Sequence, residues 1–254
     1  MKHVALISMT ILAALAATAG TLSAQQDVAN LQKALDKSVD INIANIPIGQ
    51  VFQKISTQTG AKFVLSEDAI AMLPYGDQTP LEIKLRDTTL RNSLSPMLSK
   101  LALQWNIEGD KVKIVPKEAL YRLGRRATFN ELVVLGAICS KPLKPAGTGG
   151  SAVAQLQELT GRPKLRLTFS MAAETQPAIE RADKSLPCTA AQWLDALCDN
   201  QGWTWYLQGD DINIIEQKAQ LERQLNTVVS IRYVNEDLMG VLLDLAKRAR
   251  IKLT

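Results

Sequence analysis

Three aspartates follow glycines at two sites one hundred residues apart, and grouped carboxylates could carry acid–base or metal chemistry. Gly109 precedes Asp110, and Gly209 precedes Asp210 and Asp211. A Gly-Asp pair between two runs of strand-forming residues also makes a two-residue hairpin turn, because both residue types tolerate positive φ. We therefore interpret these aspartates as turn residues and assign them no catalytic or metal-binding role.

Histidine chemistry is excluded from most of the chain. The single histidine is His3, near the N-terminus. A chain without further histidine lacks Ser-His and Cys-His nucleophile activation, histidine bases and histidine metal ligands. The segment Thr148-Gly-Gly-Ser151 lacks the lysine and the strand context of a phosphate-binding loop. The sequence thus predicts no catalytic, cofactor-binding or metal-binding residue, and a protein that is not an enzyme.

Three cysteines leave two arrangements open. They are Cys139, Cys188 and Cys198, and an odd number permits at most one intrachain disulfide. Cys188 and Cys198 bracket a predicted helix that would hold them about 15 Å apart, too far to bridge. Either Cys139 pairs with Cys188 or Cys198, or all three are small buried hydrophobic residues.

The charge balance says little about partners. The chain has 29 Lys and Arg residues against 25 Asp and Glu residues. Arg122, Arg125 and Arg126 form the only tight basic cluster. We interpret this cluster as part of a solvated linker rather than as a contact for nucleic acid or lipid.

The first 24 residues have the pattern of a secretory signal peptide. A short basic start, Met1-Lys-His3, precedes an apolar run from Val4 to Ala19, and small residues follow. This order predicts cleavage and export. No other apolar segment is long enough to cross a membrane as a helix.

The elements that position these residues are repeated along the chain. The stretch from Leu103 to Pro116 recurs from Trp203 to Glu216 without a gap, with Trp105 at the position of Trp205. A repeat at this spacing indicates an array of one module. We expect both tryptophans to fill the core of their modules.

The first module is predicted over residues 39–117, after a polar and mobile segment over residues 25–38. Alternating residues predict strands at 39–43, 62–65 and 81–85, and a hairpin at 103–115. Helical spacing predicts helices from Ile48 to Thr59 and from Leu90 to Leu101. The predicted order is β-α-β followed by β-α-β-β, an α+β fold.

A second, diverged module is predicted over residues 130–217, after a linker over residues 118–129. Leu132 to Ala137 is its candidate first strand, and residues 141–151 form an inserted mobile loop rich in glycine and proline. Thr189 caps a helix as Thr89 does in the first module. Residues 227–254 repeat the opening of the first module at an offset of 190. We expect this third module to be truncated and the sequence to be a piece of a longer polypeptide.

The opening of the third module resembles a known family. The segment from Val229 to Ala246 is similar to the start of the short N-terminal domain shared by secretins and TonB-dependent receptors. Residues 39–65 look like the same opening, and residues 81–116 look like the second half of that domain. The motifs are degenerate hydrophobic patterns, and their repetition strengthens the resemblance.

The resemblance implies periplasmic docking and oligomerisation modules that precede an outer-membrane pore. Such modules would contact copies of the same chain, as a ring, and periplasmic or inner-membrane proteins of a secretion or pilus system. The membrane-embedded part would lie beyond Thr254. The alternative within the family is a receptor-type signalling extension that contacts an anti-sigma regulator. Two complete modules and part of a third favour the secretin arrangement.

The sequence offers little support for two other classes of function, an exported hydrolase and a DNA-uptake protein. An exported hydrolase that uses carboxylates would need convergent acids. A DNA-uptake contact would need a basic stripe beyond the arginine cluster. Small sheets with open edges can pair with partners, and we expect the contacts to lie on the strands of Ile41, Ile43, Ile83 and Leu85. No cofactor and no small-molecule substrate are predicted.

Overall fold

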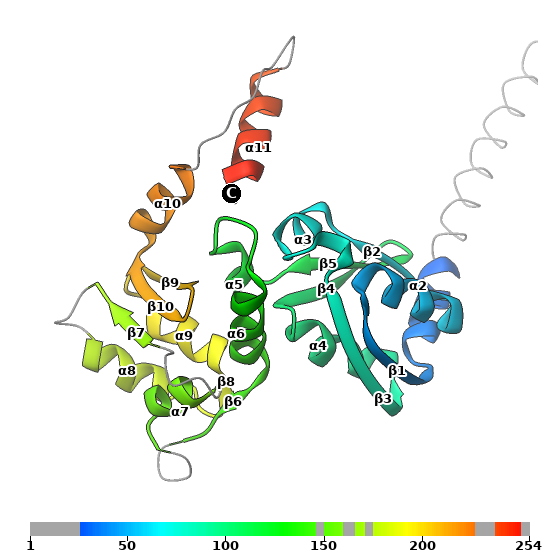
Figure 1. Ribbon diagram of the computed structural model, residues 1–254, viewed down its shortest axis with the longest axis horizontal. Helices are drawn as coiled ribbons and strands as arrows, with labels where there is room; N and C mark the ends of the chain where they lie inside the picture. The colour runs from blue at the N-terminus through cyan, green and yellow to red at the C-terminus, as the bar shows by residue number, and fades with distance from the viewer. Residues whose placement is uncertain (1–25, 146–149, 160–165, 171–174, 227–236, 250–254) are drawn as a thin grey trace, which may run out of the picture. The chain divides into compact units, whose positions relative to one another are not determined.

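The computed structural model describes residues 26–145, 150–159, 166–170, 175–226 and 237–249 (Figure 1). It is a mixed α+β structure with small sheets, and this confirms the predicted fold class. The chain forms two compact units. The first unit holds residues 1–66, 77–95 and 105–114, and the second holds residues 67–76, 96–104 and 115–254. The predicted signal peptide lies outside the described residues.

The first 116 residues contain a helix over residues 26–35 and then alternate strands with helices. The elements that follow are β1 (Ser38–Pro47), α2 (Ile48–Thr59), β2 (Lys62–Leu65), α3 (Glu67–Met72), η1 (Gly76–Gln78), β3 (Pro80–Thr89), α4 (Leu90–Ser99), β4 (Leu103–Glu108) and β5 (Lys111–Pro116). The strands and helices expected in this region are all present. The loop expected between β2 and β3 contains α3 and η1 instead.

Helix α2 lies at the centre of the first unit and has the boundaries that its sequence predicts. Pro47 precedes it, and Gly60 ends it with a φ of 82°. Ile48, Val51 and Ile55 are fully buried, and each such side chain contributes roughly 1.5–3 kcal/mol. The helix packs against β1 and β3 and also against β2. One amphipathic helix therefore joins two separate sheets.

The two sheets have different sizes. β1 pairs with β3 in an antiparallel two-stranded sheet. β5 lies between β2 and β4 in a three-stranded sheet, in which β2 runs parallel to β5. The phenyl rings of Phe52 on α2 and Phe63 on β2 stack 5.0 Å apart and fasten the helix to this second sheet.

The predicted mobile segment over residues 25–38 is wrong where the structure describes it. Residues 26–35 form a helix, and Leu31, Ala34 and Leu35 are buried. Their spacing places all three on one face, which packs in the core although most of the other residues of the helix are polar. A single apolar stripe is thus enough to order a segment of otherwise polar composition.

The remaining described chain belongs to the second unit. Its elements are α5 (Glu118–Tyr121), α6 (Phe129–Ser140), β6 (Pro142–Leu143), α7 (Ala152–Glu158), β7 (Arg166–Phe169), α8 (Thr175–Asp183), β8 (Cys188–Thr189), α9 (Ala190–Cys198), β9 (Trp203–Gln208), β10 (Asp211–Glu216), α10 (Gln217–Leu225) and α11 (Leu238–Ala249). The predicted cap at Thr189 is confirmed, because its hydroxyl accepts the Gln192 N–H and the two residues form a capping box.

The predicted strand from Leu132 to Ala137 is wrong, since this segment is the middle of α6. Thr128 and Glu131 form a capping box at the start of the helix. Most of the following residues are buried, including Leu132, Leu135 and Ile138. A helix that is apolar on nearly every side loses its helical periodicity in the sequence, and a short apolar run then resembles a strand.

The inserted loop and the third segment are each described only in part. The inserted loop over residues 141–151 begins with β6 and ends at Ser151, which caps α7. Residues 146–149 of it lie outside the described residues. In the third segment, the helix is confirmed as α11, whereas Val229, Ile231 and residues 250–254 lie outside the described residues. No helix among the described residues is long and apolar enough to cross a membrane.

The order of elements and the strand partners of the first 116 residues recur in residues 129–216. β6 pairs antiparallel with β8, as β1 does with β3. β7 runs parallel to β10, which pairs with β9, as β2 runs parallel to β5 beside β4. α6 precedes the strands of the second stretch, as the helix over residues 26–35 precedes those of the first. We call these two stretches the first repeat and the second repeat.

Within the second unit, α6 packs directly on the backbone that follows α4. A Cβ atom added at Gly136 would lie 2.1 Å from the carbonyl oxygen of Lys100. Backbone atoms cannot yield by the distance that a methyl group needs here. Gly136 is therefore required by close approach and not by chain flexibility.

We predict that Gly136→Ala lowers the free energy of unfolding by about 3 kcal/mol, because overpacking against backbone displaces α6. Denaturant unfolding of the parent and the variant measures this change. Val133→Ala on the exposed side of α6 is the control and should change stability by less than about 0.5 kcal/mol. Equal stability of the parent and Gly136→Ala would contradict the close contact.

Candidate functional site

The two hairpin turns share a left-handed glycine, and the aspartate of the first turn has a structural partner. Gly109 and Gly209 have φ values of 62° and 61°, while the aspartates that follow them do not take positive φ. Only the first turn residue is thus left-handed, as in a type II′ turn. Asp110 forms an ion pair with Lys62 on the neighbouring strand β2, and the hydrogen bond from Lys62 lowers the pKa of this carboxyl group.

Within the described ranges, no three His, Cys, Asp or Glu residues lie close enough together to hold a metal ion. All three cysteines are free thiols, so the structure holds thiols where the sequence left open a disulfide from Cys139 to Cys188 or Cys198. Burial raises the pKa of Cys139 to about 11 and that of Cys198 to about 12. Both thiols are thus protonated and poor nucleophiles at neutral pH.

The strands expected to carry contacts form the β1–β3 sheet, but their apolar side chains face inward. Ile41 lies opposite Leu85 and Ile43 opposite Ile83. Ile41, Ile43 and Ile83 are buried, and Leu85 is half-buried. Ile41, Ile43 and Ile83 pack toward α2 and are not available to a partner, whereas Leu85 is partly exposed. The side chains on the other face of the two strands are polar.

A groove of about 650 Å³ runs along this sheet. It is lined by Asp40, Ile41, Asn42, Lys84, Leu85, Arg86 and Asp87. At a β-bulge, Arg86 and Asp87 lie opposite the single residue Asp40, whose carboxylate accepts the Asp87 N–H at 2.9 Å. Among the described residues, each of the two strands pairs only with the other. The groove and the free strand edges make this sheet the candidate docking surface.

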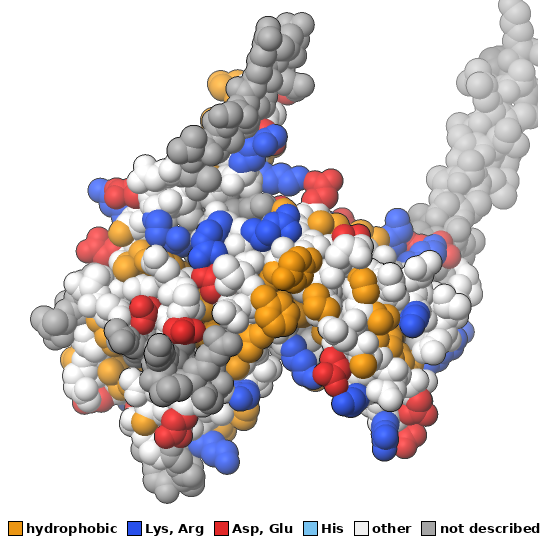
Figure 2. All heavy atoms as spheres, viewed as in Figure 1, with side chains coloured by type: hydrophobic (Ala, Val, Ile, Leu, Met, Phe, Trp, Pro, Cys, Tyr) orange, Lys and Arg blue, Asp and Glu red, His pale blue; other side chains and the backbone are white. Residues whose placement is uncertain are grey.

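The arginines of the cluster make specific contacts within the second unit, although Arg125 and Arg126 are exposed. Arg122 pairs with Asp195 at 2.8 Å, and its guanidinium lies 5.0 Å from the ring of Trp205. The Trp205 indole N–H donates to the same carboxylate. Arg126 donates to the Leu73 carbonyl at 2.8 Å. Basic side chains gather around α5 and α10 on the viewed face (Figure 2), and these arginines have partners within the second unit.

The tryptophans differ between the repeats. Trp205 is fully buried, as expected of a core residue. Trp105 is half-buried and donates its indole N–H to the Ser95 hydroxyl at 3.0 Å. Asp195 occupies in the second repeat the position that Ser95 has in the first. Trp205 therefore contacts a carboxylate and an arginine where Trp105 contacts a serine hydroxyl.

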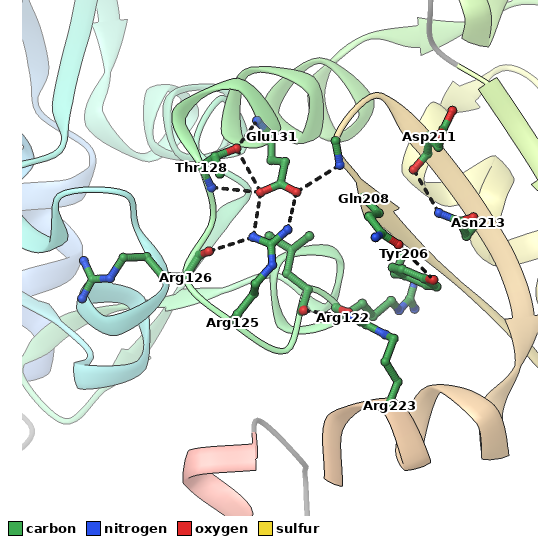
Figure 3. Close-up of polar contacts among 12 residues, drawn as sticks. Arg122, Arg125, Arg126, Thr128, Glu131, Tyr206, Gln208, Asp211, Asn213 and Arg223 are labelled. Atoms are coloured by element: carbon green, nitrogen blue, oxygen red, sulfur yellow. Dashed lines mark hydrogen bonds and ion pairs between the residues drawn. The ribbon is translucent and has the colours of Figure 1, made fainter. Parts of the chain in front are cut away.

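Glu131 is a buried structural carboxylate to which the sequence assigned no role. Its side chain is buried between Arg125, Thr128 and the backbone of the β9–β10 turn (Figure 3). Arg125 donates two hydrogen bonds to it, at 2.6 and 2.9 Å, and the Gly209 N–H donates one at 3.1 Å. The Thr128 N–H donates a further one at 2.9 Å. The sequence signal was the pattern Thr-x-x-Glu at a helix start.

Burial alone would raise the pKa of Glu131. Hydrogen bonds from the Arg125 side chain, from the N–H groups of Thr128 and Gly209 and from the Thr128 hydroxyl outweigh burial and lower the pKa to about 2. The group is thus permanently charged at neutral pH. All its oxygens are occupied by fixed donors, so it holds structure and is not free to exchange protons with a substrate.

Comparisons with protein-family models, with curated proteins and with solved structures found no match for this chain.

We predict that Glu131→Gln lowers the free energy of unfolding by about 3 kcal/mol, because the buried side chain loses its charge-assisted hydrogen bonds from Arg125 and its amide NH₂ would face N–H donors. Denaturant unfolding at neutral pH measures the change. Glu158→Gln, at an exposed position, is the control and should have little effect. A stability loss equal to that of the control would rule out the proposed role of the carboxylate.

The lowered pKa of Glu131 predicts that the free energy of unfolding falls at acid pH. Its pKa in the folded state, about 2, lies below the ordinary value of 4.5. It therefore stabilises the fold above pH 4.5, and this contribution of about 3 kcal/mol is lost as the pH falls toward 2. Unfolding curves between pH 7 and pH 2 should show this loss in the parent and a weaker one in Glu131→Gln. Parallel pH profiles of the two proteins would contradict the assignment.

Proposed function

We propose that the chain is an array of non-catalytic docking modules, exported to the periplasm and associated with an outer-membrane system of the secretin type. The modules would bind copies of the same chain and proteins of a secretion or transport machine. The observation that carries this proposal is the β1–β3 sheet with its groove and its free edges. Open strand edges are common sites at which one protein adds a strand or a surface to another.

The recurrence of one topology supports stacking rather than signalling. The first and second repeats share their order of elements and their strand partners. A receptor-type extension usually carries one module of the resembled family, whereas secretins stack several. The repeated arrangement therefore favours the secretin-like role.

The chemistry of the charged groups also supports a role in binding. The shifted carboxyl groups have partners that explain them, such as Lys62 for Asp110 and Arg125 for Glu131. Asp36 pairs in the same way with Arg91. Shifted groups in such pairs hold elements together, and a catalytic group would instead face a substrate site. This distribution fits a protein whose surface binds partners.

The double substitution Lys84→Glu/Arg86→Glu reverses the charge along the groove, where both side chains are exposed. We predict that it raises the dissociation constant for self-association by roughly tenfold or more, a change of about 1.4 kcal/mol per tenfold. Sedimentation of the purified protein over a range of concentrations measures the change. The melting temperature should stay within about 2 °C of the parent, because both positions face solvent.

Lys33→Glu/Lys54→Glu is the matched control. It makes the same change in net charge at exposed positions on the helix over residues 26–35 and on α2. Self-association should then resemble that of the parent. Equal weakening by both double variants would indicate a general effect of charge. Unchanged association of Lys84→Glu/Arg86→Glu would remove the β1–β3 sheet as the docking surface.

A further inference from the structure

The fold brings a fourth arginine to the cluster of Arg122, Arg125 and Arg126. Arg223 on α10 donates to the carbonyl of Arg122 and to that of Leu123, which lies 100 residues earlier in the chain. The sequence shows only the three neighbouring arginines, so the tertiary structure enlarges this basic surface of the second unit. We call Arg125, Arg126 and Arg223 the arginine surface.

Part of the charge on the arginine surface has no counter-ion. Arg125 pairs with Glu131. Among the described residues, neither Arg126 nor Arg223 forms an ion pair, and their hydrogen bonds go to neutral oxygens. Burial and, as a smaller effect, the charge of Arg125 lower the pKa of Arg223. The fold thus holds two positive charges in place that an anion can neutralise.

The guanidinium groups are held in position by the protein itself. Arg126 donates to the Leu73 carbonyl at 2.8 Å, and Arg125 donates to the Arg126 carbonyl at 3.0 Å. Arg223 lies 4.0 Å from the centroid of the Tyr206 ring. A guanidinium has five N–H groups, and Nε and Nη2 of Arg126 have no acceptor among the described residues. Donors that are already fixed lose little conformational entropy when a ligand binds.

The arginines are spread out and do not converge on one point. Figure 3 shows Arg126 pointing away from Arg125, while Arg223 reaches the same loop from α10. A single phosphate group needs several donors aimed at one centre. Separated donors suit a chain that carries one anion at each of several positions. The surface therefore fits spaced carboxylates better than one small anion.

The small extent of the charge favours a peptide over a nucleic acid or a membrane. Nucleic acids and anionic bilayers present many phosphates over a large area, and proteins bind them through larger basic clusters. An exposed aromatic residue also lies beside the arginine surface. Tyr75 is 60% exposed and follows Pro74, whose carbonyl accepts a hydrogen bond from Arg126 at 3.4 Å. Arginine and tyrosine are enriched at the residues that dominate binding between proteins.

We propose that the arginine surface binds an extended acidic segment of a partner protein. Spaced Asp or Glu carboxylates of that segment pair with Arg126 and Arg223, and an apolar side chain between them contacts Tyr75. Arg125 stays with Glu131 and adds to the positive potential. The proposal is independent of the docking surface on β1 and β3, because it concerns only residues of the second unit.

Fluorescence anisotropy with the full chain tests the proposal. The probe is a labelled peptide with Asp at every second position and one Phe at its centre, and the matched peptide has Asn in place of Asp. The parent should bind the Asp peptide, and the affinity should fall as salt is added. Arg126→Gln/Arg223→Gln should raise the dissociation constant roughly tenfold or more, because two charge-assisted contacts are lost.

Lys33→Gln/Lys54→Gln is the matched control. It removes the same charge at exposed positions of the first unit and should bind the Asp peptide like the parent. Arg126→Gln alone keeps the test valid if the double variant does not fold, since Arg126 is exposed. It should raise the dissociation constant roughly threefold.

Four outcomes would overturn the proposal. The first is no binding of the Asp peptide by the parent up to about 1 mM. The second is equal affinity for the Asn peptide, and the third is equal weakening by the control variant. The fourth is tighter binding of a single-stranded oligonucleotide, or of vesicles with anionic phospholipid, than of the Asp peptide. The surface would then recognise phosphates and not carboxylates.

Discussion

The buried carboxylate of Glu131 connects three segments on which the second unit depends. It accepts hydrogen bonds from Arg125 before α6, from Thr128 at the start of α6 and from Gly209 in the β9–β10 turn. A buried charge is stable only where fixed donors surround it. The path of the chain between the repeats, the start of α6 and the position of the hairpin are therefore mutually dependent.

Several of the contacts that join elements of the second unit are polar. Arg122 covers Trp205 and pairs with Asp195, and α10 binds the carbonyls after α5 through glutamines and Arg223. Such contacts are directional, because each needs a donor and an acceptor at a set distance. They fix the orientation of the elements that they join within the second unit.

The proposed docking role rests on a shared architecture rather than on a reactive group. In the first repeat, α2 covers one face of a two-stranded sheet, and among the described residues neither strand pairs with a third. The outer face is polar and grooved, so it favours specific contacts over nonspecific aggregation. The thiols of Cys139 and Cys198 are buried and protonated, and the carboxyl groups with lowered pKa are paired.

The sequence by itself determined the hairpins, the amphipathic helices α2, α4, α9 and α11, and the turn role of Gly109 and Gly209, because these features depend on residues close together in the chain. It did not reveal that α6 is a helix, since burial on nearly every side removes the periodic pattern. It identified the alternating strands β1 and β3, but only packing on α2 decided that Ile41 and Ile83 face inward. The Thr-x-x-Glu pattern marks Glu131 as a capping residue, but its contact with Gly209, 78 residues away, was decided by the tertiary structure.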